Sequence, residues 1–192
     1  SIGRTFEESL MKAWRSIGQG EGYPECLDWD EHRLKKNLKV PNDRRLHVIW
    51  TYLKNHKATQ KSIEEVCTIT DFHAFFIERI ARLVRLEIEA EDCKEDLHDE
   101  LLINLKKNGF GDKHISHLTG LSQKYIRDKR KKLNLISSFL MVDTCAGEFE
   151  AKTPYFYSTY ADKKEPIETG KSIVILGSGP IRIGQGIEFD YY

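Results

Sequence analysis

The chain has 192 residues, with 30 basic and 30 acidic side chains and a formal net charge of zero. Its content of 31% charged and 40% hydrophobic residues is typical of a well-solvated globular protein rather than a disordered one. The balanced charge argues against a dedicated nucleic-acid-binding or membrane-surface protein. No apolar run in the sequence approaches the length of a membrane-spanning helix.

The cysteines are widely separated, and none forms the C-x-x-C spacing of a metal or redox motif. A secreted domain held by disulfides usually has a denser set of cysteines in a shorter chain. We therefore expect reduced thiols and a cytoplasmic location. The four cysteines are Cys26, Cys67, Cys93 and Cys145.

The first third of the sequence predicts a series of helices. Thr5 and Glu8 have the spacing of a capping box, in which each side chain satisfies a free backbone N–H, and they predict a helix over 5–17. Three more helices are expected over 30–38, 43–56 and 62–67.

The longest periodic segment follows Asp71, which we expect to cap a helix over 72–90. Its apolar residues recur at helical spacing and form a wide stripe. Such a stripe most often packs in a core, so we predict that its members are buried. They are Phe72, Phe75, Phe76, Ile80, Leu83 and Val84.

An acidic stretch from Glu87 to Glu100 holds eight acidic residues and one lysine. A helix with Leu97, Leu101 and Leu105 on one face overlaps its end. This helix should end at residues 108–109, because a glycine suits the left-handed position that follows a helix.

The segment from Gly109 to Leu135 predicts a helix-turn-helix, with the turn at 119–121 and Ser122 capping the second helix. Six basic residues lie between Lys124 and Lys132, where they could contact nucleic-acid phosphates. Two helices joined by a glycine turn are also common in helical bundles, and the basic run could instead face the acidic stretch. The neutral chain favours the second interpretation, and a nucleic-acid-binding module is the alternative.

After Leu135 the sequence favours short extended segments, at 141–149 and at 153–160, where Pro154 argues against a central strand. Residues 161–171 are polar and predict a linker. Ile173–Leu176 then predicts a buried strand that feeds a glycine-rich turn with Gly177, Gly179, Gly184 and Gly186. The fold class is therefore mainly α: an irregular domain of about six to eight helices, short extended segments, and the first strand of a truncated α/β domain.

The glycine-rich turn does not have the G-x-G-x-x-G spacing of a dinucleotide-binding loop, because its third glycine comes two residues late. This irregular spacing argues against a stand-alone dinucleotide enzyme, and we interpret the glycines as structural. Since one strand cannot form a domain, we expect the chain to be a piece of a longer polypeptide.

No group of residues predicts catalysis or metal binding. His114 and His117 could share a helix face, but zinc needs further ligands at defined spacing. Cys145 has no histidine paired to it by spacing and is expected to be a buried structural thiol. Glu188 and Asp190 are two residues apart, so they do not share a helix face and are left as structural.

Four stretches of the sequence are distinctive together. They are SIGRTFEESLMKA at 1–13, VDTCAGEF at 142–149, YFYSTY at 155–160 and LGSGPIRIGQGIEFDY at 176–191. In this order and spacing they resemble the large subunit of carbamoyl-phosphate synthase, at the region that joins its two homologous halves. The resemblance runs from one end of the chain to the other.

The resemblance implies a ligase that makes carbamoyl phosphate from bicarbonate, glutamine or ammonia, and two ATP with Mg²⁺, for arginine and pyrimidine synthesis. Residues 1–17 would be the tail of the first ATP-grasp half, 18–165 a helical oligomerisation domain, and 170–192 the start of the second half's pre-ATP-grasp domain. The ATP-grasp domains lie outside this chain, so the resemblance assigns it no catalytic, cofactor-binding or metal-binding residue. The implied partners are other large subunits and a glutaminase small subunit, with no nucleic acid or membrane.

Overall fold

The computed structural model describes residues 1–17, 20–94, 96–150 and 155–160. These residues form eight helices and one two-stranded antiparallel sheet, which confirms the prediction of a mainly α fold. No helix within the described ranges is long and apolar enough to cross a membrane. The predicted strand at 173–176 and the glycine-rich turn lie outside the described residues.

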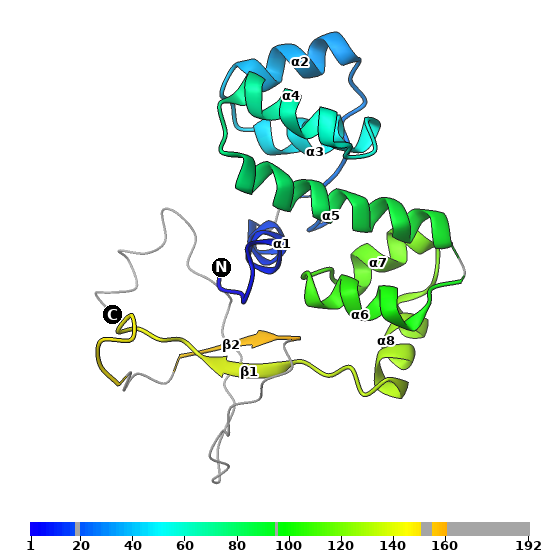
Figure 1. The fold of residues 1–192 in the computed structure, drawn as a ribbon. Helices are drawn as coiled ribbons and strands as arrows, with labels where there is room; N and C mark the ends of the chain where they lie inside the picture. Colours follow the sequence, from blue (N-terminus) through cyan, green and yellow to red (C-terminus); the bar gives the residue numbers. More distant parts are fainter. Residues whose placement is uncertain (18–19, 95, 151–154, 161–192) are drawn as a thin grey trace, which may run out of the picture.

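The longest helix, α5, runs through the middle of the molecule (Figure 1). Helices α3 and α4 pack on one side of it, together with α2, and α1 and α7 pack on the other, next to α6 and α8. The helices are α1 (Phe6–Ile17), α2 (Glu31–Lys39), α3 (Arg45–Asn55), α4 (Gln60–Thr70), α5 (Ala74–Cys93), α6 (Asp99–Lys107), α7 (Asp112–Thr119) and α8 (Gln123–Lys132).

Because α5 has neighbours on two sides, its buried surface is wider than a single stripe. Ile80, Leu83 and Val84 are buried as predicted, and Ile77 and Leu86 join them. The core continues through buried side chains of α2, α3, α6 and α7. A carboxylate, Glu87, lies inside the same buried surface.

The first turn of α5 differs from the prediction. Asp71 does not cap α5; it has a left-handed backbone with φ 57° and ends α4, which is longer than expected. Aspartate tolerates this conformation better than most residues. His73 caps α5 instead, because its Nδ1 accepts a hydrogen bond from the Phe75 N–H at 3.2 Å.

The burial predicted for the three phenylalanines of this segment is wrong. Phe72, Phe75 and Phe76 are 41%, 42% and 46% exposed. The rings of Phe75 and Phe76 pack only edge-on against Phe6 of α1, with centroid separations of 6.3 and 5.5 Å. The apolar stripe therefore extends beyond the part of α5 that its described neighbours cover.

The sheet is a hairpin of β1 (Ser138–Met141) and β2 (Phe156–Thr159), in which Ser138 pairs with Thr159. Leu140 and Thr159 are buried, whereas Phe139 and Phe156 are exposed on the other face. The extended prediction at 153–160 is confirmed for β2. The one at 141–149 is wrong beyond residue 142, because turns fill this segment and two of its residues have positive φ.

Candidate functional site

The predicted helix-turn-helix is present as α7 and α8. Gly120 makes the turn with φ 75°, and the Ser122 side chain accepts a hydrogen bond from the Tyr125 N–H. Within the basic run, Lys129 donates to the Leu97 carbonyl and forms an ion pair with Asp99 at 2.9 Å. The basic run therefore does meet the end of the acidic stretch.

The remaining basic residues of α8 divide into two groups. Arg130 forms a 2.6 Å ion pair with Asp112 at the start of α7. The other four, Lys124, Arg127, Lys131 and Lys132, are exposed. Part of the basic run thus stabilises the helix pair, and nucleic-acid binding stays an untested alternative.

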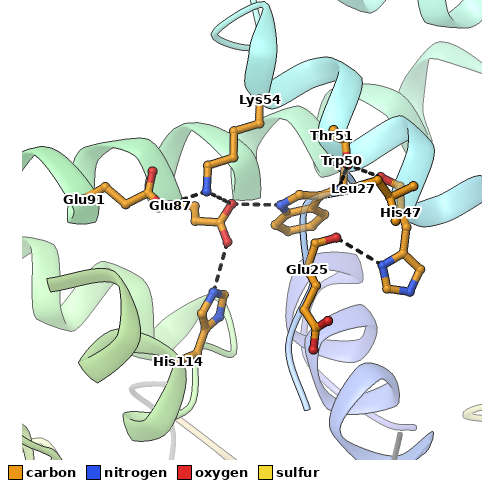
Figure 2. Close-up of polar contacts among 9 residues, drawn as sticks. All are labelled: Glu25, Leu27, His47, Trp50, Thr51, Lys54, Glu87, Glu91 and His114. Atoms are coloured by element: carbon orange, nitrogen blue, oxygen red, sulfur yellow. Dashed lines mark hydrogen bonds and ion pairs between the residues drawn. The ribbon is translucent and has the colours of Figure 1, made fainter. Parts of the chain in front are cut away.

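Three elements meet at Glu87 of α5, whose side chain is only 2% exposed (Figure 2). One carboxylate oxygen, Oε2, accepts a hydrogen bond from Trp50 Nε1 at 2.8 Å and pairs with Lys54 Nζ at 3.1 Å. The other oxygen, Oε1, lies 3.0 Å from Nε2 of the equally buried His114. We call these four residues the Glu87 node; it joins α3, α5 and α7.

The node has a defined charge state. Burial by itself raises the pKa of Glu87, but the hydrogen bonds from His114 and Trp50 and the charge of Lys54 outweigh it and hold the pKa below its ordinary value. Burial lowers the pKa of His114 and outweighs the opposing effect of Glu87. Both directions favour a charged Glu87 carboxylate beside a neutral His114 ring, whose Nε2 is the nitrogen placed to donate to Oε1.

His114 and His117 lie on the same side of α7 and contact one aromatic ring. Both rings stack on Tyr23, at centroid separations of 4.5 and 5.1 Å. The described residues contain no group of three or more histidine, cysteine, aspartate or glutamate side chains placed to hold a metal ion. Nδ1 of His114 is buried and has no hydrogen-bond partner among these residues, as suits a neutral ring.

A second buried carboxylate, Glu8 of α1, ties the hairpin to the first helix. Its Oε2 accepts hydrogen bonds from the Arg4 N–H at 2.8 Å and from Thr159 Oγ1 at 3.1 Å. Its Oε1 pairs with Lys12 at 2.9 Å, and Lys12 also donates to the Ser158 carbonyl. The capping box is thus half confirmed: the Thr5 hydroxyl accepts from the Glu8 N–H, but the Glu8 carboxylate binds Arg4 and Thr159.

The residue after β2, Tyr160, is held by the other end of the helical bundle. Arg130 donates to its hydroxyl at 3.0 Å, and Lys106 lies 5.0 Å from its ring centroid. Lys106 itself is buried and pairs with Asp112 at 2.9 Å. Burial is the largest effect on the pKa of Lys106 and lowers it. The hairpin strand is therefore fixed at Thr159 by α1 and at Tyr160 by α6 and α8.

The other candidate residues of the sequence analysis lie in the turn after β1 or outside the described residues. Cys145 is half-buried in the turn after β1 rather than buried, and Asp143 accepts a hydrogen bond from its backbone N–H. Gly177, Gly179, Gly184, Gly186, Glu188 and Asp190 lie outside the described residues.

The sequence did contain a signal for the Glu87 node. Glu87 follows Leu83 and Val84 by one helical turn, so it occupies a core position in the apolar stripe. An ionisable residue at such a position is rare unless it is paired.

Comparison with known proteins places the chain in a family. The model of the carbamoyl-phosphate synthetase large chain oligomerisation domain matches residues 1–134. The chain belongs to the carbamoyl-phosphate synthase large-chain family. A second model, of the carbamoyl phosphate synthase preATP-grasp domain, matches residues 169–192.

The similarity to relatives covers the whole chain. The carbamoyl phosphate synthase large chains of Methanosarcina acetivorans and Methanosarcina barkeri are each 46% identical to it, and that of Methanosarcina mazei is 45% identical. These alignments cover 100% of this chain but 17% of each relative. The chain thus spans about a sixth of the length of the curated relatives it matches, and the family resemblance inferred from the four sequence stretches is confirmed.

Proposed function

We propose that this chain joins the two synthetase halves of a cytoplasmic carbamoyl-phosphate synthase large chain. The whole enzyme would be a ligase that makes carbamoyl phosphate from bicarbonate, glutamine or ammonia, and ATP with Mg²⁺, for arginine and pyrimidine synthesis. A glutaminase small subunit would supply its ammonia. Membership of the large-chain family supports this proposal.

The observation that carries the joining role is the contact between the first helix and the last described strand. Glu8 binds Thr159, a residue 151 positions further along the chain, and both side chains are buried. The first helix and the last described strand therefore lie side by side, although the segment between them is long. Such an arrangement holds two flanking domains in a fixed relation, rather than separating them by the length of the helical bundle.

We assign no catalysis to the chain itself. The buried charged groups of the described residues are occupied with contacts between helices and strands; they are Glu7, Glu8, Glu87 and Lys106. Residues 1–17 would lead from the first half, 18–165 would form the helical domain, and 170–192 would begin the second half.

Calorimetry with Mg²⁺-ATP tests this assignment. The isolated chain should show neither saturable nucleotide binding nor ATP hydrolysis, and the full-length large chain, measured in parallel, should show both. Saturable ATP binding by the isolated chain would contradict the proposed division of labour.

Self-association is the second part of the proposed role, in line with the description of the matching family model as an oligomerisation domain. Sedimentation velocity over a range of concentrations should show the isolated chain forming dimers or larger species. A strict monomer at the highest concentration would contradict it.

A further inference from the structure

The β1–β2 hairpin has one face that is apolar and exposed. In the antiparallel register Phe139 lies opposite Ser158 and Met141 lies opposite Phe156, so these four side chains share a face. Phe139 and Phe156 are 48% and 43% exposed. Neither strand contains a charged residue. We call these four residues the outer face of the hairpin.

The opposite, inner face of the hairpin packs toward α1 and is more polar than the outer face. Thr159 Oγ1 donates a hydrogen bond to Glu8 of α1, and Ser138 Oγ donates to the Thr159 carbonyl. Both hydroxyl side chains are buried. The residues of the inner face are Ser138, Leu140, Tyr157 and Thr159.

This distribution is the reverse of the one expected for a hairpin with one face in water. An antiparallel sheet packed on one side directs its apolar residues toward its partner and its polar residues toward water. Exposed strands are often protected by charged side chains as well, and β1 and β2 have none. A two-stranded sheet is also marginally stable by itself. The alternation therefore indicates a hairpin that is covered on both faces, with its apolar face against a second partner.

We propose that the outer face packs against the second synthetase half of the same polypeptide. This inference rests on the proposed function, in which residues 170–192 begin that half. The two matching family models cover residues 1–134 and 169–192, so the hairpin lies between them in the sequence. It packs on the first of these two regions through its inner face, and its outer face is left for the second.

The chain itself brings this partner close to the hairpin. Tyr160, the residue after β2, is held on α8 by the hydrogen bond from Arg130. Residues 161–168 separate it from the match to the preATP-grasp domain, and a segment of that length spans at most about 29 Å. A partner tethered so closely has a high effective concentration, and a second copy of the chain lacks this advantage. The first half would connect through α1, which lies on the inner face.

Photo-crosslinking in the full-length large chain tests the proposal. In two separate variants, Phe139 and Phe156 are replaced by the photoreactive aromatic residue p-benzoylphenylalanine, and crosslinked peptides are identified by mass spectrometry. Both positions should crosslink to peptides that follow residue 169 in the same polypeptide. The matched control has the same replacement at Tyr125, an exposed aromatic residue of α8. It should give about tenfold fewer of these crosslinks, because only a docked surface stays in contact with its tethered partner.

The outcomes separate the possible partners of the outer face. Crosslinks to peptides of the first half, or no crosslinks beyond residue 169, would overturn the proposal. In a mixture of heavy-isotope-labelled and unlabelled large chains, crosslinks between a labelled and an unlabelled peptide would assign the face to a second copy and overturn it too. Equal yields from the hairpin positions and from Tyr125 would do the same. ATP binding by the isolated chain would refute the proposed function without changing the crosslinks, so the two inferences can fail independently.

Discussion

Replacing Glu87 with glutamine is the sharpest test of the Glu87 node. The amide keeps the shape of the side chain but not its charge, and its single oxygen cannot accept from both Trp50 and His114 in the present geometry. Removing one partner of a buried charged pair typically costs about 3–5 kcal/mol. Lys54 is 20% exposed and keeps a second partner, Glu91, at 2.7 Å, so we expect a smaller loss of about 2–3 kcal/mol.

Urea denaturation followed by tryptophan fluorescence and far-UV circular dichroism measures this loss. In a separate thermal unfolding experiment, the melting temperature should fall by roughly 4–12 °C, at about 2–4 °C per kcal/mol for a chain of this size. The matched control is Glu91→Gln, which removes the exposed partner of the same lysine and should change the unfolding free energy by less than about 0.5 kcal/mol.

The reasoning fails if Glu87→Gln unfolds at the same urea concentration as the unmodified chain. It also fails if the two variants lose the same stability. Either result would mean that burial of the carboxylate is not the source of its contribution. A change in the slope of the unfolding free energy against urea concentration would instead indicate an altered unfolded state.

Three further predictions concern His114, Thr159 and Gly109. Burial lowers the pKa of His114 below about 6.5, so at lower pH the folded chain binds fewer protons than the unfolded chain. The contribution of His114 to stability should be complete above pH 6.5 and should fall as the pH drops through the folded-state pKa. His114→Gln should flatten this part of the curve of unfolding free energy against pH, and His117→Gln should not. Thr159→Val should lower the unfolding free energy by about 1–2 kcal/mol and accelerate amide exchange in the hairpin without affecting α5. Amide exchange in β1 and β2 that is the same before and after the substitution would contradict the role of Glu8. Gly109→Ala should cost about 2–5 kcal/mol in chemical denaturation, because φ is 90° and the added Cβ would lie 3.0 Å from the Met11 Cβ. Gly120→Ala, with positive φ but no atom within 4 Å of its Cβ, should cost only about 1–2 kcal/mol, and equal losses would refute the steric argument.

Local signals in the sequence predicted much of the helical structure. Gly109 is the clearest case: it follows α6 with positive φ, its N–H bonds to the Lys106 carbonyl, and the Phe110 N–H bonds to the Leu105 carbonyl. These are the two hydrogen bonds of a Schellman motif, which depends on residues close in sequence. Ser122 at the start of α8 was predictable for the same reason.

Features that depend on tertiary neighbours could not be predicted in the same way. Phe75 and Ile80 belong to one apolar stripe, but Ile80 is buried and Phe75 is exposed. Periodicity shows which residues share a face and does not show how far along the helix its neighbours extend. The role of Thr159 depends on Glu8, and no local pattern in the sequence connects two residues so far apart.

Of the three buried glutamates among the described residues, Glu7, Glu8 and Glu87, the last two explain why the helical domain has one arrangement rather than several. Apolar cores tolerate many combinations of side chains of similar volume, so the core of this domain does not by itself fix how its helices are aligned. Hydrogen bonds are directional, and a buried carboxylate that loses a partner is costly. Glu87 therefore fixes α5 against α3 and α7, and Glu8 fixes the hairpin against α1. Since α1 is the first helix and β2 the last described strand, the alignment at Glu8 fixes the position of one relative to the other, as the proposed joining role requires.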